Sequence, residues 1–220
     1  MKVLSIGLIT SGYSLVEHGI LELAAVVIDE QKNVLETFNN ASMKLLEGQK
    51  YDQQYKNNAL TKNKNKIMDI MANGSDPKDI ITAFHEWVDW CFTKYNDVHI
   101  VYDSRLVKID MLSLYLCKYG YPPLNHIKKD GKIFNRKLID TSTYHCGLFR
   151  INPDQWLTDV IYKNYNININ HGVKYDSFEI AHFIAQRHIM ALSWKSHQTM
   201  LTSKQFPQKT IVLKRSNVHH

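Results

Sequence analysis

His171 and Asp176 are the first residues whose types and spacing could support catalysis. Asp176 follows His171 by five residues and lies at the start of a predicted amphipathic helix. A carboxylate is favoured near a helix N-terminus, and a histidine on the preceding loop could reach the same site. Such a pair can hold a divalent cation and deprotonate its bound water. The spacing equally fits a helix-capping aspartate beside a surface histidine, so the pair alone does not define a function.

Asp110 is a second candidate ligand. It falls within a helix predicted over residues 104–119, as the only charge on a row that includes Leu106 and Cys117. We expect this row to be half-buried. Because an unpaired buried charge is costly, Asp110 is predicted either to form a salt bridge or to bind a metal.

Strands and helices alternate in the order needed to position these residues. Apolar, β-branched runs predict strands at 3–10, 20–29 and 34–40, and their short turns favour an antiparallel meander. A helix is predicted to begin at Pro77 with Asp76 as its cap. Further elements are predicted as strands at 99–102, 138–140 and 210–214, helices at 104–119, 152–165 and 176–194, and a basic loop at 125–137. This order indicates an α/β fold with a mixed sheet.

Length and composition limit the classes of function that the chain can have. The chain has 220 residues, a formal net charge of +6 and a pI of about 9.0, which favours polyanionic partners. No apolar run approaches the roughly 20 residues of a membrane span, and no signal peptide is recognised. The three cysteines are far apart and form no C-x-x-C pair, which predicts buried thiols in a cytoplasmic protein. We expect one domain over 1–195, with a Lys/Asn-rich insertion at 43–75 and a C-terminal extension at 196–220.

The chain resembles the DEDDh branch of the DEDD 3′–5′ exonucleases, which includes proofreading exonucleases, oligoribonucleases and RNase T-like enzymes. Residues 20–27, ILELAAVV, match the apolar strand after the family's first motif, with Glu22 in its acidic position. Asp110 falls where the second motif has its Asp, and His171 and Asp176 match the H-x4-D of the third. Asp140 resembles an Asp that often lies between those motifs. Over residues 1–195 the resemblance implies an RNase H-like mixed sheet flanked by helices.

The first motif departs from the family. Aligning Thr10-Ser11-Gly12 with the T-T-G of D-x-E-T-T-G puts Gly7 and Ile9 where the catalytic Asp and Glu belong. In the family these carboxylates help to hold two divalent cations, Mg²⁺ or Mn²⁺. Residues 1–16 contain no Asp or Glu, so Glu17 and Glu22 are the nearest substitutes. The resemblance therefore implies a pseudoenzyme with lost or weakened exonuclease activity and no required metal. An active Mg²⁺- or Mn²⁺-dependent enzyme with a rearranged site is the alternative.

A cleft of this kind could still hold a single-stranded RNA or DNA 3′ end through stacking and basic contacts. The residues expected to bind it are Tyr13, Arg105, Lys108, Lys174 and Tyr175. Further candidates expected near the cleft are Tyr102, Lys128, Lys129 and Arg136. A third hypothesis is a protein-interaction module built on the old exonuclease fold. The sequence favours neither RNA nor DNA and leaves the oligomeric state open.

Overall fold

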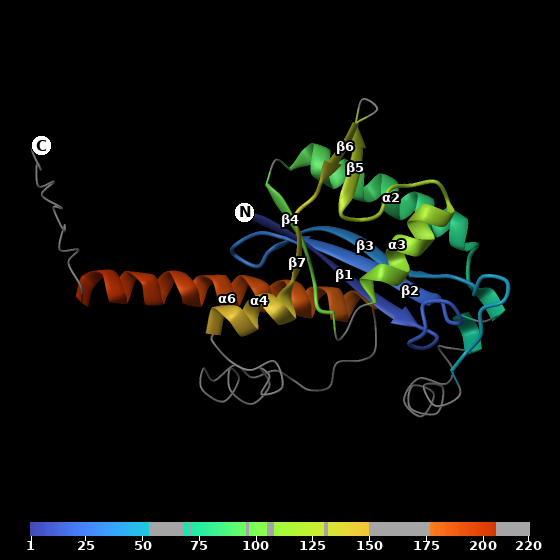
Figure 1. Ribbon diagram of the computed structural model, residues 1–220, viewed down its shortest axis with the longest axis horizontal. Helices are drawn as coiled ribbons and strands as arrows, with labels where there is room; N and C mark the ends of the chain where they lie inside the picture. Colours follow the sequence, from blue (N-terminus) through green and yellow to red (C-terminus); the bar gives the residue numbers. More distant parts are fainter. Residues whose placement is uncertain are drawn as a thin grey trace, which may run out of the picture.

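The computed structural model describes residues 1–52, 68–70, 72–95, 97–104, 108–129, 132–149 and 177–205 (Figure 1). The helix predicted over 152–165 and the strand predicted over 210–214 lie outside these residues. Within the described ranges, every helix lacks either the length or the apolar character needed to span a bilayer.

A five-stranded mixed sheet forms the centre of the fold. Its order is β3-β2-β1-β4-β7; β1–β2 and β2–β3 pair antiparallel, whereas β1–β4 and β4–β7 pair parallel. The predicted meander and mixed α/β sheet are therefore confirmed. The strands are β1 (Lys2–Thr10), β2 (Ile20–Ile28), β3 (Val34–Ser42), β4 (Val98–Tyr102) and β7 (Leu138–Asp140).

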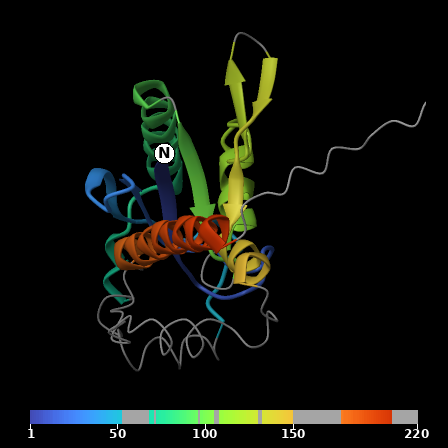
Figure 2. The same ribbon diagram turned by 90° about the vertical axis from the view of Figure 1, so that its left-hand side faces the viewer.

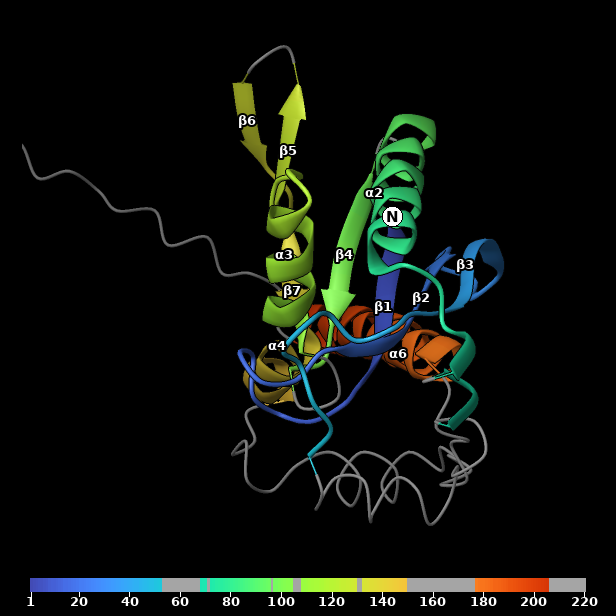
Figure 3. The same ribbon diagram turned by 90° about the vertical axis from the view of Figure 1, so that its right-hand side faces the viewer.

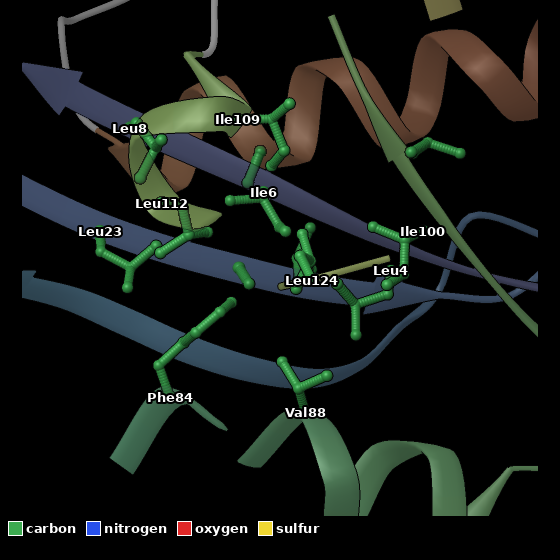
Figure 4. Packing of buried hydrophobic residues seen from close by; sticks show 14 of the residues in the cluster. Leu4, Ile6, Leu8, Leu23, Phe84, Val88, Ile100, Ile109, Leu112 and Leu124 are labelled. Carbon is green, nitrogen blue, oxygen red and sulfur yellow. The ribbon is translucent and has the colours of Figure 1, made fainter. Parts of the chain in front are cut away.

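The two faces of β1 contact different helices. Successive side chains of a strand point to opposite faces, and Leu4, Ile6 and Leu8 lie in the core between the sheet and helices α2 (Pro77–Lys94) and α3 (Ile109–Lys118) (Figure 4). The other face is covered by α6 (Ser177–Gln205), which runs across β1 and β2 (Figure 2). Side chains at positions 5, 7 and 9 therefore belong to the α6 face.

Helix α2 begins as its sequence signals predict. The Asp76 side chain accepts a hydrogen bond from Lys78 N, and Pro77 occupies the first turn, where its missing N–H is not needed. Ile81, Phe84 and Val88 form its buried stripe. Burial of this stripe holds α2 on the sheet.

Helix α3 starts later than predicted and presents a different row to the solvent. It begins at Ile109, because Lys108 has a non-helical backbone. Asp110 and Cys117 are both exposed, so the half-buried row expected for them was wrong. The core-facing residues of α3 are instead Met111, Leu112, Tyr115 and Leu116. The expectation that all three thiols are buried was wrong for Cys117, which is exposed, whereas Cys91 and Cys146 are buried.

Three further parts of the chain differ from the prediction. The expected basic loop at 125–137 contains an antiparallel hairpin made of β5 (His126–Lys129) and β6 (Lys132–Asn135). A helix that was not predicted, α4 (Thr141–Phe149), follows β7 directly. Helix α6 continues to Gln205, past the end predicted at residue 194.

Candidate functional site

The candidate site lies where three parallel strands end together. β1, β4 and β7 run in the same direction, so Thr10, Tyr102 and Asp140 close the strands at one edge of the sheet. Antiparallel β2 begins at this edge, opposite the end of β1. Ligands of open α/β sheets commonly bind beyond the carboxyl ends of their parallel strands, which makes this edge the natural place to look for function.

Gly7 lies in direct contact with the start of α6. A Cβ placed on Gly7 would lie 2.8 Å from both the Ala181 nitrogen and the Ser177 carbonyl carbon, and closer still to the Ser177 carbonyl oxygen. These are backbone atoms, so no side-chain rotation can make room. A carboxylate at position 7 is therefore incompatible with α6 as it packs here. Position 9, on the same face, is occupied by apolar Ile9.

Glu22 lies across from Ile9 in the β1–β2 register and is fully buried. Its Oε1 accepts hydrogen bonds from the Ser177 backbone N (2.8 Å) and from Ser177 Oγ (2.7 Å). Ser177 is the first residue of α6, where a carboxylate interacts favourably with exposed backbone N–H groups. Glu22 thus anchors the start of α6 against the sheet, across 155 residues of sequence.

The loop after β1 has a fixed conformation. Ser11 Oγ accepts from Gly19 N and donates to the Lys50 carbonyl, each at 2.9 Å. His18 Nδ1 accepts from Ser14 N at 2.9 Å, and its ring lies so close to Gly12 that a Cβ there would be 2.6 Å away. These contacts leave Tyr13, Leu15 and Val16 exposed to solvent.

Glu17 lies on the outer side of this loop. Its Oε1 accepts a hydrogen bond from Lys50 Nζ at 2.8 Å, and both side chains are mostly exposed. The hydrogen bond from Lys50 lowers the pKa of the Glu17 carboxyl. Glu17 therefore forms a surface ion pair in the structure.

Tyr13 and Lys108 meet at this edge from two different elements. The Tyr13 side chain is 65% exposed, and Lys108 Nζ lies 5.5 Å from the centre of its ring. This is within the range of a cation–π interaction. An exposed aromatic ring beside a lysine ammonium offers a stacking surface and a positive charge together.

Three more residues of this edge are acidic or aromatic. Burial raises the pKa of the half-buried Tyr102 hydroxyl, and the negative charges of Asp140 and Asp110 raise it further. Burial also opposes ionisation of Asp140, but hydrogen bonds from Thr143, Ser142 and Ser104 outweigh it and lower the pKa of that carboxyl. Asp140 thus connects the ends of β4 and β7 to the first turn of α4, while exposed Asp110 stands at the start of α3.

Asp103 is a residue of this edge that the sequence did not single out. It directly follows β4, is fully buried, and accepts a 2.6 Å hydrogen bond from Arg187 Nη2 of α6. Its position immediately after an apolar strand was the available signal. No sequence signal identified its partner Arg187, which lies on α6, 84 residues away.

The other predicted site residues divide into two groups. Those outside the described residues are Arg105, His171, Lys174, Tyr175 and Asp176. Lys128, Lys129 and Arg136 lie in or beside the β5–β6 hairpin, which joins the start of β7, so the structure puts them at the opposite edge of the sheet (Figure 3). Their expected place near the cleft was wrong, because a hairpin carries this segment away from the carboxyl ends.

The carboxylates described at this edge do not fit the family's two-metal site. Positions 7 and 9 lack ligands, Glu22 holds Ser177, and Asp103 holds Arg187. Within the described ranges, no three or more His, Cys, Asp or Glu side chains form a group that could hold a metal ion.

Buried His188 makes the stability of the fold depend on pH. His188 of α6 is buried beside His145 and Tyr144 of α4, with ring centroids 5.6 and 5.4 Å away. Burial, with the positive charges of His99, Arg187 and Lys137, lowers the pKa of His188 to about 4. The unfolded chain binds this proton near pH 6.5. His188 should therefore contribute stability above pH 6.5 that is lost as the pH falls towards 4, by up to about 3 kcal/mol.

Urea unfolding measured between pH 4 and pH 8 checks this expectation. The His188→Leu protein should lose less stability than wild type over the same interval. Equal slopes for the two proteins would contradict a neutral, buried His188.

Comparisons with known proteins agree with this architecture. The nuclease domain of 3′hExo, a DEDDh family member, bound to rAMP, superposes with a TM-score of 0.63 at 11% identity, covering 87% of this chain and 92% of that one. The zinc-bound form of the E. coli ExoI–ssDNA complex gives 0.61 at 15% identity, covering 94% of this chain and 43% of that one. A 3′-exonuclease structure describing 3′-end-specific recognition of a histone mRNA stem-loop gives 0.61 at 9% identity, covering 89% of this chain and 64% of that one.

Sequence comparisons alone do not reach these proteins. No family model matches the chain, and no curated protein matches it. The chain spans less than half of exonuclease I and just under two thirds of the stem-loop-binding 3′-exonuclease. What the structural neighbours share with it is the overall fold. The chain therefore has the RNase H-like fold of the DEDDh 3′ exonucleases.

Proposed function

We propose that this protein binds the 3′ end of a single-stranded nucleic acid and has lost, or strongly weakened, the two-metal cleavage that the resemblance to the DEDDh family implies. The observation that carries the proposal is the pairing of exposed Tyr13 with Lys108 at the carboxyl ends of the parallel strands. It lies beside a strand end from which both expected carboxylates are missing.

The contacts of Gly7 support the proposed loss of cleavage. Two-metal hydrolysis needs several carboxylates to hold the cations that activate the attacking water and stabilise the leaving oxygen. Here α6 packs directly on Gly7, and Glu22 holds α6 in that position. The backbone at Gly7 and the carboxylate of Glu22 thus both contact the start of α6.

The retention of binding follows from the Tyr13 loop. Bases stack on exposed aromatic rings, and a neighbouring cation attracts the phosphates. The chain's net charge of +6 supports a polyanionic partner. The structural neighbours were seen with rAMP, with single-stranded DNA and with an mRNA stem-loop.

The affinity of Tyr13→Ala tests the proposed binding. Loss of one base-stacking ring costs about 1–3 kcal/mol, so binding of a 5′-labelled single strand should weaken about 5- to 150-fold. Fluorescence anisotropy with RNA and DNA strands of the same sequence would measure the change. Tyr13→Phe should bind nearly as wild type, because the ring is retained.

Trp90→Ala provides a matched control. Trp90 is a half-exposed aromatic on α2 with Lys94 Nζ 4.5 Å from its ring, and the C-terminal end of α2 precedes the start of β4, at the other edge of the sheet. Its loss should leave affinity unchanged. Equal weakening by Trp90→Ala and Tyr13→Ala would contradict a binding site at the carboxyl ends.

A cleavage time course separates the alternatives. The labelled strands would be incubated with Mg²⁺, Mn²⁺ or EDTA, with Asp176→Ala alongside to reveal contaminating nuclease. A metal-dependent ladder that shortens from the 3′ end and is lost in Asp176→Ala would establish the active enzyme instead. Weak binding that does not change with salt would favour the protein-interaction module, since phosphate contacts make affinity fall steeply with salt.

A further inference from the structure

The β5–β6 hairpin is a separate two-stranded ribbon at the edge of the sheet where the parallel strands β1, β4 and β7 begin. Its rungs pair His126 with Asn135 and end with Lys129 opposite Lys132. Among the described strands, β5 and β6 pair with each other and not with the five-stranded sheet. Figure 3 shows the ribbon extending away from α6 and from the carboxyl ends of β1 and β4.

The base of the ribbon is fixed to the body of the protein. Arg136 is buried, donates from Nη2 to Asp89 of α2, and lies with its guanidinium 4.5 Å from the centre of the Phe92 ring. Its backbone N donates to the Asn125 carbonyl at 2.8 Å, which closes the base. Leu124, just before the first strand, is buried in the core. The ribbon thus has a defined direction relative to the sheet.

Positive charge is concentrated in this short segment. Residues 126–137 hold five basic residues and one acidic residue, a net charge of +4 (five minus one) out of +6 for the whole chain. The basic residues are Lys128, Lys129, Lys132, Arg136 and Lys137. Arg136 is used at the base, while the three strand lysines occupy the half of the register that is farther from this base.

This charge works against folding of the ribbon. A two-stranded ribbon is only marginally stable by itself, and like charges directly opposite each other destabilise it further. Lys129 and Lys132 form such a rung. Lysines at sheet edges also discourage strand association, but that role does not require two lysines at one rung of the register. A polyanionic partner would relieve the repulsion.

We propose that the β5–β6 hairpin binds the phosphate backbone of duplex DNA, independently of the site at the carboxyl ends of β1, β4 and β7. Four residues per strand give the ribbon a length of about 13 Å. The major groove of B-form DNA, about 12 Å wide, admits a two-stranded ribbon. The major groove of an RNA duplex is too narrow and deep for such an element, and a single strand has no groove.

A closed dumbbell of duplex DNA is the decisive probe, because it has no 3′ end for the other site to hold. Its affinity would be measured by anisotropy over a series of salt concentrations. Each phosphate contact adds about 0.9 to the slope of log affinity against log salt. K128Q/K129Q/K132Q should therefore reduce the magnitude of this slope by about 2–3, and its unfolding temperature should not fall, because a like-charge rung has been removed.

K44Q/K78Q/K118Q is the matched control. These three lysines are exposed elsewhere on the fold, and both triple variants have the same formal net charge of +3 (+6 minus three). The control should keep nearly the wild-type slope, and Tyr13→Ala should bind the dumbbell normally. An equal slope loss in both triple variants, no binding of the dumbbell by wild type at low salt, or equal binding of an RNA dumbbell would each overturn the proposal.

Discussion

Gly7→Ala is expected to lower the free energy of unfolding by about 2–3 kcal/mol, the upper part of the range for overpacked cores. The added methyl group would meet backbone atoms of Ser177 and Ala181 at the start of α6. A flexible side chain could rotate away, but the backbone can yield only if the helix shifts on the sheet. That shift would also strain the hydrogen bonds from Ser177 to Glu22.

Urea unfolding followed by tryptophan fluorescence would measure this loss, with Gly147→Ala as the matched control. A Cβ at Gly147 meets no atom within 4 Å, and the residue lies in helix α4. Alanine there should stabilise the protein by about 0.5–1 kcal/mol, because it lowers the backbone entropy of the unfolded chain. If Gly7→Ala were as stable as wild type, β1 and α6 could not be in the contact described here.

The contact between Gly7 and α6 also predicts that the family's first carboxylate cannot be restored by a substitution at position 7. Gly7→Asp should destabilise the protein at least as much as Gly7→Ala, because a buried charge adds to the overlap. The Gly7→Asp/Ile9→Glu protein should therefore gain no metal-dependent cleavage in the time course described above. A gain would mean that α6 can move aside, and would favour the active-enzyme alternative.

The elements that the sequence predicted well are those specified by local patterns. β1 and β2 have long apolar runs and α2 has a strong cap, and the bounds of the two strands and the start of α2 lie within one residue of the prediction. The hairpin was missed although its signal was present: Asp130-Gly131 separates two short runs, a sequence typical of a two-residue hairpin turn. The start of α3 was placed too early because Lys108 has a non-helical backbone and no glycine or proline marks that position.

The site was harder to predict because its key contacts are distant in sequence. The resemblance puts Gly7 and Ile9 at the positions of the family's first two carboxylates, but nothing in the sequence indicates that α6 closes on Gly7. Likewise Glu22 has the residue type of a ligand, and only its contact with Ser177 identifies it as a helix anchor. Residue type and spacing thus identified the positions to compare with the family, while packing shows that backbone atoms of α6 occupy the space beside Gly7.

Breaking the Asp103–Arg187 pair should have the largest effect of the expected substitutions. Asp103 is fully buried and Arg187 nearly so, with 2.6 Å between Oδ2 and Nη2. Asp103→Ala removes the carboxylate that accepts from the buried guanidinium of Arg187, at a cost of about 3–5 kcal/mol. Arg187→Met should cost a similar amount for the converse reason. Urea unfolding of both single variants would measure these losses.

The double variant tests whether the Asp103–Arg187 pair serves only to hold α6 in place. Asp103→Ala/Arg187→Met removes both charges, so it should be more stable than either single variant and give a positive coupling in a double-mutant cycle. Glu17→Ala is the exposed control: its 2.8 Å ion pair with Lys50 lies in solvent, where such pairs contribute little, and stability should hardly change. If Asp103 serves only to hold α6 at the end of β4, the double variant should also bind single strands as wild type does. A double variant that folds but no longer binds would instead make Asp103 or Arg187 part of the binding site, and the binding of the two single variants would show which of them it is.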